Sequence, residues 1–266
     1  MDHTLITPLT APLYALSGLL VGVLVGMTGI GGGSLMTPLL VFVFGFDPKV
    51  AVGTDLLFAA ITKSKGVWVH HGGHGSVEWR IVGLLASGSI PSALVILYLL
   101  EHIQVERAFI TAVIGIASVL TGVAMLYYDR LQRQDQAPRE TKPDFIGLWR
   151  TPVTVFTGVV IGVLVTLSSV GAGAIGTIAL LFLYPRLATV RIVGSDLAHA
   201  VPLTALAGLG YWHMGSVNFA LLAALLVGSL PGIYFGSHLS ARVPDKILRP
   251  VLASLLLGIG LKFALA

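Results

Sequence analysis

Two aspartates stand out because each follows a glycine and a hydroxyl residue inside a long apolar stretch. Gly53-Thr54-Asp55-Leu56 and Gly194-Ser195-Asp196-Leu197 are near-copies of each other, and His199 follows the second copy. Residues three apart share a helix face, so His199 lies on the face of Asp196. An ionised Asp near the bilayer centre costs about 2.5–3.5 kcal/mol on insertion scales, so such residues mark ion or proton paths. We therefore predict proton coupling or gating by Asp55, Asp196 and His199.

A structural interpretation of the same aspartates stays open. Asp47-Pro48 has the pattern of an N-cap followed by proline at the first helical position. This cap would place Asp55 about 12 Å along the helix axis, and Thr189 is a possible cap for the helix of Asp196. If Thr54 and Ser195 were the true caps, both aspartates would instead be first-turn groups.

A glycine-rich motif occurs twice, each time between two apolar stretches. Thr28-Gly-Ile-Gly-Gly-Gly33 is followed by Ser34, and Ser168-Ser169-Val-Gly171-Ala-Gly173 is a degenerate second copy. Three glycines in a row should break a helix, and a break inside the bilayer is tolerated only where it lines a cavity or is buried in protein. The free N–H groups of the next helix, starting near Ser34, and its positive dipole end would suit a small oxyanion. Close helix packing is the alternative.

The predicted anion contacts come from both copies and from the two hydroxyls beside the aspartates. They are Thr28, Gly29, Gly31, Gly32, Gly33, Ser34, Ser168, Ser169, Gly171, Ala172, Gly173, Thr54 and Ser195. An aspartate near a bound anion repels it, so anion binding should favour proton uptake. Lys63 lies near the inner end of its helix, where we expect its side chain to snorkel to the interface. Attraction of anions to the inner mouth is the other interpretation of Lys63.

The composition is that of a polytopic membrane protein. Of the 266 residues, 55% are hydrophobic and 11% charged, there is no cysteine, and the mean hydropathy is +0.91. Soluble domains carry roughly 25% charged residues, so a soluble enzyme, a disordered protein and a disulfide-stapled domain are excluded. The net charge of +4 does not indicate nucleic-acid binding, because the basic residues lie in short loops.

Ten apolar segments are visible, five in each half. They cover 10–28, 34–46, 48–69, 79–100, 107–128, 151–168, 173–185, 190–212, 217–240 and 246–265. A full span needs about 20 residues. The segments 34–46 and 173–185 are shorter, so they are either short spans or legs of re-entrant hairpins.

The two halves are related by an internal repeat. The motif Gly18-xxx-Gly22 returns as Gly158-xxx-Gly162, and three further matches follow in the same order at an offset of 140 or 141. With an odd number of crossings per half, Lys and Arg divide 13 to 3 between inside and outside, against 9 to 7 for four crossings. Because Lys and Arg favour the cytoplasmic side, the odd number is preferred and the halves are inverted.

The predicted fold is an all-α polytopic membrane protein with two inverted repeats and Gly-broken helices or re-entrant hairpins near the midplane. Its parts are a first repeat (1–128), a cytoplasmic linker (129–150) and a second repeat (151–266). The termini are then periplasmic. Duplicated halves of this kind are common in transporters.

The chain resembles the sulfite exporter TauE/SafE family, also called the toluene-sulfonate uptake permease family. The resemblance rests on Gly26-Met-Thr-Gly-Ile-Gly-Gly-Gly-Ser-Leu-Met-Thr-Pro-Leu-Leu, on Gly53-Thr-Asp-Leu, and on the degenerate copies at 168–183 and 194–199. It implies a bacterial inner-membrane location and transport of a sulfur-containing anion such as sulfite, thiosulfate or sulfoacetate. The second copy has Ser169 and Ala172 in place of glycines, so the two half-sites differ.

We therefore expect a transporter that exports such an anion by alternating access. Its partners are the small anion and the lipid bilayer, with protons as the candidate coupling ion and a homo-oligomer left open. No cofactor, metal, catalytic residue or nucleic acid is expected. The alternatives are a proton-coupled uptake permease, an anion channel and, least favoured, an intramembrane enzyme using Ser195, Asp196 and His199.

Overall fold

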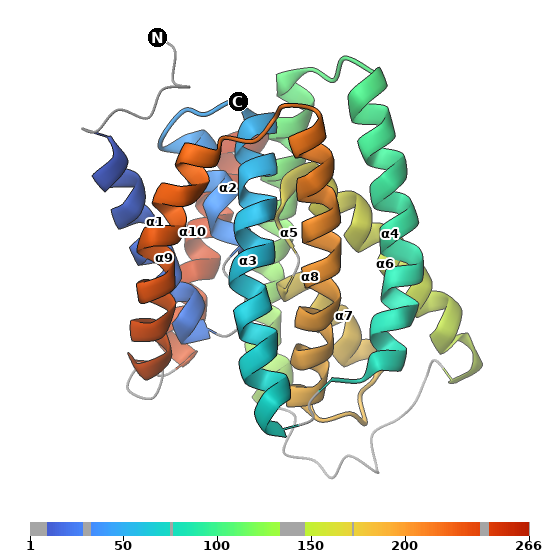
Figure 1. The fold of residues 1–266 in the computed structure, drawn as a ribbon. Helices are drawn as coiled ribbons and strands as arrows, with labels where there is room; N and C mark the ends of the chain where they lie inside the picture. The colour runs from blue at the N-terminus through green and yellow to red at the C-terminus, as the bar shows by residue number, and fades with distance from the viewer. Residues whose placement is uncertain are drawn as a thin grey trace.

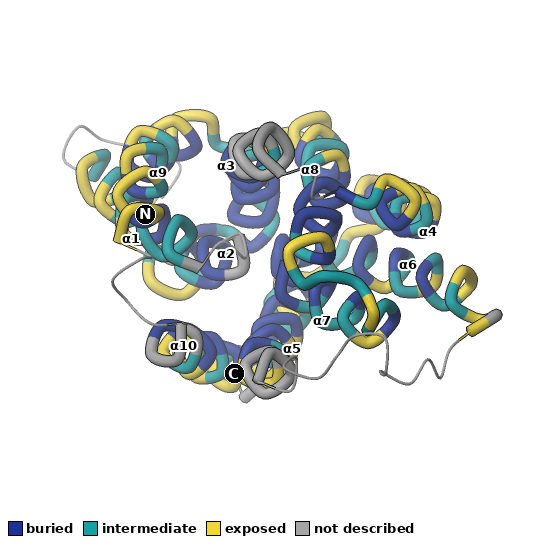
Figure 2. Tube along the Cα trace, turned by 90° about the horizontal axis from the view of Figure 1, so that it is seen from below, coloured by how far each residue is buried: buried dark blue, intermediate teal, exposed yellow. Residues whose placement is uncertain are grey.

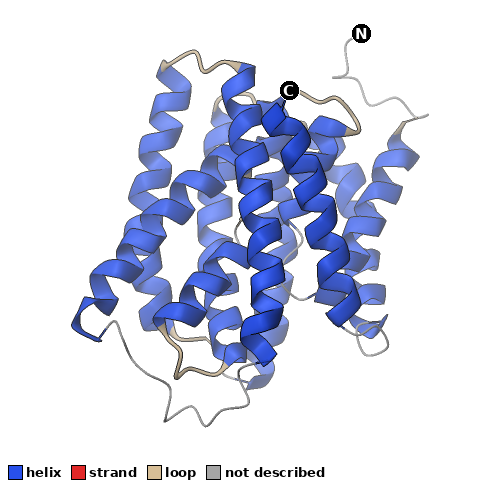
Figure 3. Ribbon diagram, turned by 180° about the vertical axis from the view of Figure 1, so that it is seen from behind, coloured by secondary structure: helices blue, strands red, loops and turns tan. Residues whose placement is uncertain are grey.

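The computed structural model describes residues 10–28, 33–74, 77–133, 147–171, 173–239 and 245–265. Within these ranges the chain forms ten α-helices, one short 3-10 helix and no strand (Figures 1 and 3), which confirms the all-helical prediction. In order, the helices are α1 (Ala11–Thr28), α2 (Gly33–Phe42), α3 (Pro48–His74), α4 (Trp79–His102), α5 (Arg107–Arg133), η3 (Gly147–Trp149), α6 (Arg150–Ser168), α7 (Ala174–Leu183), α8 (Thr189–His213), α9 (Phe219–Leu239) and α10 (Asp245–Leu265). The ten α-helices correspond one to one with the ten apolar segments.

In the part of the chain that the structure describes, five helices are long and apolar enough to cross a membrane. They are α4, α6, α8, α9 and the Arg107–Tyr127 part of α5. By contrast, α2 and α7 have ten residues each, which gives about 15 Å, half of a ~30 Å hydrocarbon core. The outer faces of α4 and α9 expose large apolar side chains, among them Tyr98 and Val227. These features are those of a multi-pass membrane protein.

The main packing pairs each join one helix of the first half to one of the second. α1 packs on α9, α4 on α6, α5 on α10, and α3 on α8. Figure 1 shows α3 and α8 side by side, with α3 starting at the top and α8 starting at the bottom. The buried residues gather where α3, α8 and α5 face one another (Figure 2). Two equivalent halves related by a two-fold axis would produce this exchange of partners.

Equivalent glycines bring the α1–α9 and α4–α6 backbones into contact. A Cβ added at Gly22 would lie 2.5 Å from the carbonyl oxygen of Ser229, and one at Gly162 would lie 2.5 Å from that of Ser89. No side chain fits at either position. Small residues four apart on a helix allow this approach inside a membrane.

The helix caps decide between the two interpretations of the aspartates. The Asp47 carboxylate accepts the N–H of Lys49 at 2.9 Å, so Asp47 caps α3 as predicted. The prediction of Thr189 as a cap is wrong, because extended Ala188 is the N-cap and Thr189 is already helical. Asp55 and Asp196 are each the eighth residue of their helix. They are not first-turn groups, so Thr54 and Ser195 do not cap these helices.

The second glycine motif interrupts the helical structure between α6 and α7. Ser169 adopts a left-handed conformation with φ 57°, and Gly171 and Gly173 have φ values of 98° and 136°. The first motif separates α1 from α2, which begins at Gly33, near the predicted start. Residues 29–32 of that motif lie outside the described residues. The predicted domain limits are not tested by these boundaries and stay a prediction.

Candidate functional site

Each buried aspartate is held by a threonine from the short helix of its own half. Oδ2 of Asp55 accepts the N–H of Thr37 at 3.1 Å and its hydroxyl at 2.6 Å. Oδ2 of Asp196 accepts the hydroxyl of Thr177 at 2.8 Å. Both carboxyl groups are fully enclosed by protein. Thr37 and Thr177 occupy equivalent positions after the two glycine motifs, so the arrangement is repeated.

Among the described residues, the second oxygen of each buried carboxyl group has no hydrogen-bond partner. This holds for Oδ1 of Asp55 and Oδ1 of Asp196 alike. At Gly176 of α7 an added Cβ would lie 2.9 Å from Cγ of Asp196 and would overlap Oδ1. An unsatisfied buried polar atom costs about 1–3 kcal/mol or more. In native proteins such atoms are accounted for by strain, by a functional role, or by a bound water or ion.

Two buried hydroxyls near the interruption between α6 and α7 have no hydrogen-bond partner among the residues that the structure describes. Oγ of Ser169 is one, and it lies near enough to Asp55 to interact with that carboxyl without hydrogen-bond geometry. Oγ1 of Thr121, on α5, is the other, 3.8 Å from the Cβ position of Gly171. The break of the second half therefore lies beside the aspartate of the first half. Together these atoms form a polar interior with unfilled hydrogen-bonding capacity.

Lys63 is buried in this interior. Its exposed fraction is 3%, and it interacts electrostatically with Asp55, Asp196 and His199. The expectation that its side chain snorkels to the interface is therefore wrong, because the packing of α3 and α8 encloses it. The sequence signal for this burial is a Lys two turns beyond an Asp within one apolar helix.

His199 is a point at which the two halves differ. Its Nε2 lies 2.7 Å from the hydroxyl of Ser89 on α4. In the other half the equivalent positions are Phe58 and Ser229, and the Ser229 hydroxyl is buried without a partner. His199 therefore gives the second half a titratable group that the first half lacks.

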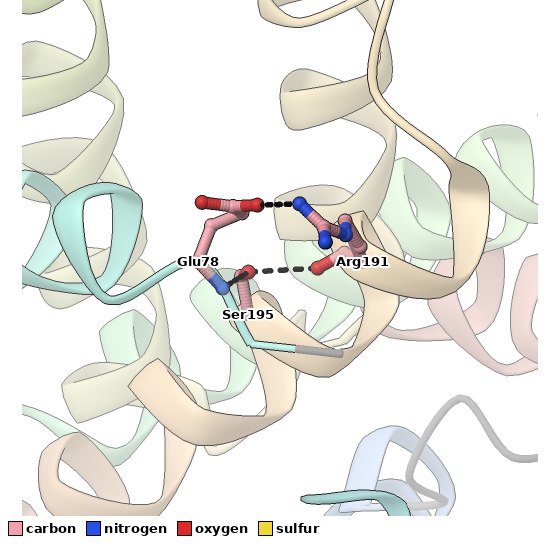
Figure 4. A network of polar contacts seen from close by, with 3 residues as sticks. All are labelled: Glu78, Arg191 and Ser195. Atoms are coloured by element: carbon pink, nitrogen blue, oxygen red, sulfur yellow. Dashed lines mark hydrogen bonds and ion pairs between the residues drawn. The ribbon is translucent and has the colours of Figure 1, made fainter. Parts of the chain in front are cut away.

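Thr54 and Ser195 hold the starts of helices from the opposite half. The Thr54 hydroxyl accepts the N–H of Asn218 at 3.1 Å, before α9. The Ser195 hydroxyl accepts the N–H of Glu78 at 2.8 Å, before α4, and donates to the carbonyl of Arg191 at 2.7 Å. Figure 4 shows this second contact, which an ion pair between Glu78 and Arg191 reinforces.

The intramembrane-enzyme alternative gains no support from these contacts. Ser195 donates to a backbone carbonyl, and His199 pairs with Ser89 instead of Ser195. Within the described residues, no three His, Asp or Glu side chains could together hold a metal ion. The polar interior can instead take up protons at its carboxyl groups and bind an anion through Lys63 and the hydroxyls.

The other predicted anion contacts are only partly described. The side chains of Thr28 and Ser34, and residues Gly29, Gly31, Gly32 and Ala172, lie outside the described residues. Gly33 begins α2 and Ser168 ends α6, and Gly171 and Gly173 lie in the break. The Ser168 hydroxyl donates to the Leu164 carbonyl at 2.6 Å. Ligand contact by these residues, and by Thr54 and Ser195, stays a prediction.

Comparison with known proteins gives matches along nearly the whole chain. The family model described as Sulfite exporter TauE/SafE matches residues 14–263. "Probable membrane transporter protein YjnA" of Bacillus subtilis is 39% identical over 257 residues, covering 93% of this chain and 97% of the relative. "Probable membrane transporter protein YdhB" of the same organism is 26% identical, covering 90% and 96%. No solved structure matches the chain.

Proposed function

Because the chain belongs to the sulfite exporter TauE/SafE family, we propose that it moves a small sulfur-containing anion across the bacterial inner membrane. The proposed substrates are sulfite, thiosulfate and organosulfonates such as sulfoacetate. The observation that carries the proposal is the pair of buried aspartates, each of which accepts a hydrogen bond from a threonine in the short helix α2 or α7. A polar interior with unsatisfied atoms inside an apolar protein is expected along a transport path.

In this proposal the anion sits between the N-terminal ends of α2 and α7. The first N–H groups of α2 and α7 have no partner within their own helices, and the positive dipole ends favour an anion there. The hydroxyls of Ser169 and Thr121 supply further donors. Two inverted halves would rock around the site and expose it to each side in turn. Export is the expected direction, since the exit of an anion from a negative interior is favourable by about 2.3 kcal/mol per elementary charge and 100 mV.

Proton coupling is the second candidate, favoured by the unpartnered oxygens. Oδ2 of each carboxyl group already accepts donors from a threonine. A proton therefore belongs on Oδ1, where it would form a donor free to bind an oxygen of the substrate. Binding the anion and the proton together removes the like-charge repulsion of Asp55 and Asp196. Uptake against the membrane potential would then be possible.

The test is flux in proteoliposomes loaded with labelled sulfite, thiosulfate or sulfoacetate. Membrane potential and pH gradient are varied independently. Saturable flux driven by the potential alone supports an anion exporter, and flux that needs the pH gradient supports proton coupling. Absence of flux for every sulfur anion overturns the substrate class, and flux that does not saturate indicates a channel.

Asp196→Asn separates the proton role from a structural one. We expect this variant to lose the pH dependence of flux, whereas Glu101→Gln keeps it. Glu101 is the matched control because its side chain is 47% exposed. Unchanged pH dependence in Asp196→Asn would remove Asp196 from the coupling mechanism.

A further inference from the structure

Lys63 is a buried cation for which neither the glycine motifs nor the hydroxyl contacts give a role. It is the sixteenth residue of α3, so it lies about 22 Å along the axis from the helix start, and Asp55 about 10 Å. Burying an ammonium group inside a membrane protein is costly, and such groups mark substrate or ion pathways. Its position therefore needs an explanation beyond packing.

The depth of Lys63 lies between those of the two aspartates. α3 and α8 pack together and start at opposite ends of the molecule (Figure 1). Asp196 lies about 10 Å from the start of α8, a helix of 25 residues and about 36 Å. Asp196 is therefore near the other end from Asp55, and Lys63 interacts electrostatically with both.

The equivalent position in the second half carries no charge. It is Thr204, buried, whose hydroxyl donates to the carbonyl of Ala200 at 2.8 Å. The repeat therefore supplies two carboxyl groups and one ammonium group along the α3–α8 pair. A site with one cation is suited to one anionic head group at a time.

We propose that Lys63 is the residue that binds the anionic head group of the substrate, with Asp55 and Asp196 as its alternating counter-ions. This inference rests on the proposed function and deepens it. Three N–H donors of the ammonium group match the oxygens shared by sulfite and sulfonates. When the anion binds Lys63, the released carboxylate takes up one proton, so the anion and one proton enter together. Among the described side chains, the titratable groups that interact with Lys63 are Asp55, Asp196 and His199.

The experiment compares Lys63→Gln, Lys63→Arg and the control Lys262→Gln, an exposed cation on α10. Binding is read as the stabilisation of the purified protein against heat by sulfite, thiosulfate, sulfoacetate, phosphate and chloride. A charge-assisted hydrogen bond is worth about 1.5–3 kcal/mol, so Lys63→Gln should weaken binding by about 10- to 100-fold. Lys63→Arg should retain most of the affinity, and Lys262→Gln all of it.

Two further measurements keep the inference falsifiable. If Lys63→Gln does not fold, the double variant Asp55→Asn/Lys63→Gln removes the unpaired carboxylate, and it should fold without binding anions. In weakly buffered solution, anion addition should cause proton uptake by the unmodified protein and not by Lys63→Gln.

The outcomes separate this inference from the proposed function. Equal anion binding and equal proton uptake in Lys63→Gln and the unmodified protein would overturn the role of Lys63, even if sulfur anions are transported. Loss of binding in Lys63→Gln, with phosphate or chloride as the only ligand bound by the unmodified protein, would support the role of Lys63 and overturn the sulfur substrate.

Discussion

Gly228→Ala should destabilise the protein by separating α1 from α9. A Cβ at Gly228 would overlap the carbonyl oxygen of Ala15 and lie 2.7 Å from both the carbonyl carbon of Ala15 and the backbone nitrogen of Leu19. Carbon contacts are normally ~3.5–4.0 Å, so the helices must move apart by about 1 Å. Because the obstacle is backbone, no rotamer change can relieve it. Overpacking of this kind costs about 1–3 kcal/mol.

Gly83→Ala is the matched control with the opposite expected sign. Gly83 lies on the exposed face of α4, with no atom within 4 Å of an added Cβ. Alanine in a helix interior is favoured over glycine by up to about 1 kcal/mol. Thermal unfolding in detergent, followed by tryptophan fluorescence, measures the Tm of both variants. At about 2–4 °C per kcal/mol, Gly228→Ala should lower Tm by ~2–12 °C and Gly83→Ala should leave it equal or higher. A Gly228→Ala protein as stable as the unmodified one would refute the backbone contact.

Three further predictions concern the site and its surroundings. Gly176→Ala should displace the carboxyl group of Asp196 and abolish pH-dependent flux while the protein still folds, as measured by flux and size-exclusion chromatography. Thr37→Val removes the 2.6 Å hydroxyl bond to Asp55 and keeps the backbone N–H bond, and it should lower the free energy of unfolding by about 1.5–3 kcal/mol in denaturant titrations. Glu78→Gln breaks the ion pair next to Ser195 and should increase maleimide labelling of a single cysteine introduced at position 195.

The labelling experiment has a built-in control. Asp47 and Arg107 form a 2.7 Å ion pair within the first half, so Arg107→Gln should leave labelling at position 195 unchanged. The chain contains no cysteine, so no background thiol must be removed. Equal labelling with and without Glu78→Gln would argue against opening at that contact.

The length of the helices could be predicted because apolar runs report it directly. The two short runs after the glycine motifs became the ten-residue helices α2 and α7. The cap at Asp47 was also predictable, because Asp followed by Pro fixes a helix start locally. Thr189 failed as a cap because the turn before it places Ala188 in the capping position.

The contacts between the halves were not predictable from one sequence. Ser89 pairs with His199 across 110 residues, and Glu78 meets Ser195 across 117. Glu78, the residue before α4, has no local pattern that points to Ser195, and the repeat of Ser89 as Ser229 does not indicate a histidine partner. The burial of Lys63 has the same origin, since it depends on the helices that pack against α3, α8 foremost among them. Thr37 and Thr177 could have been found, because they repeat at the offset of the glycine motifs.

The exchange of helix partners between the halves has a consequence for synthesis of the protein. α1 ends at Thr28, but α9, the helix that covers its glycine face, begins at Phe219. At ~5–20 residues per second, the ribosome makes α9 about 10–40 s after α1. During that interval the small-residue face of α1 is open to lipid or to insertion factors. The nascent chain therefore completes its native packing late, and a chain truncated before α9 should be a target for membrane quality control.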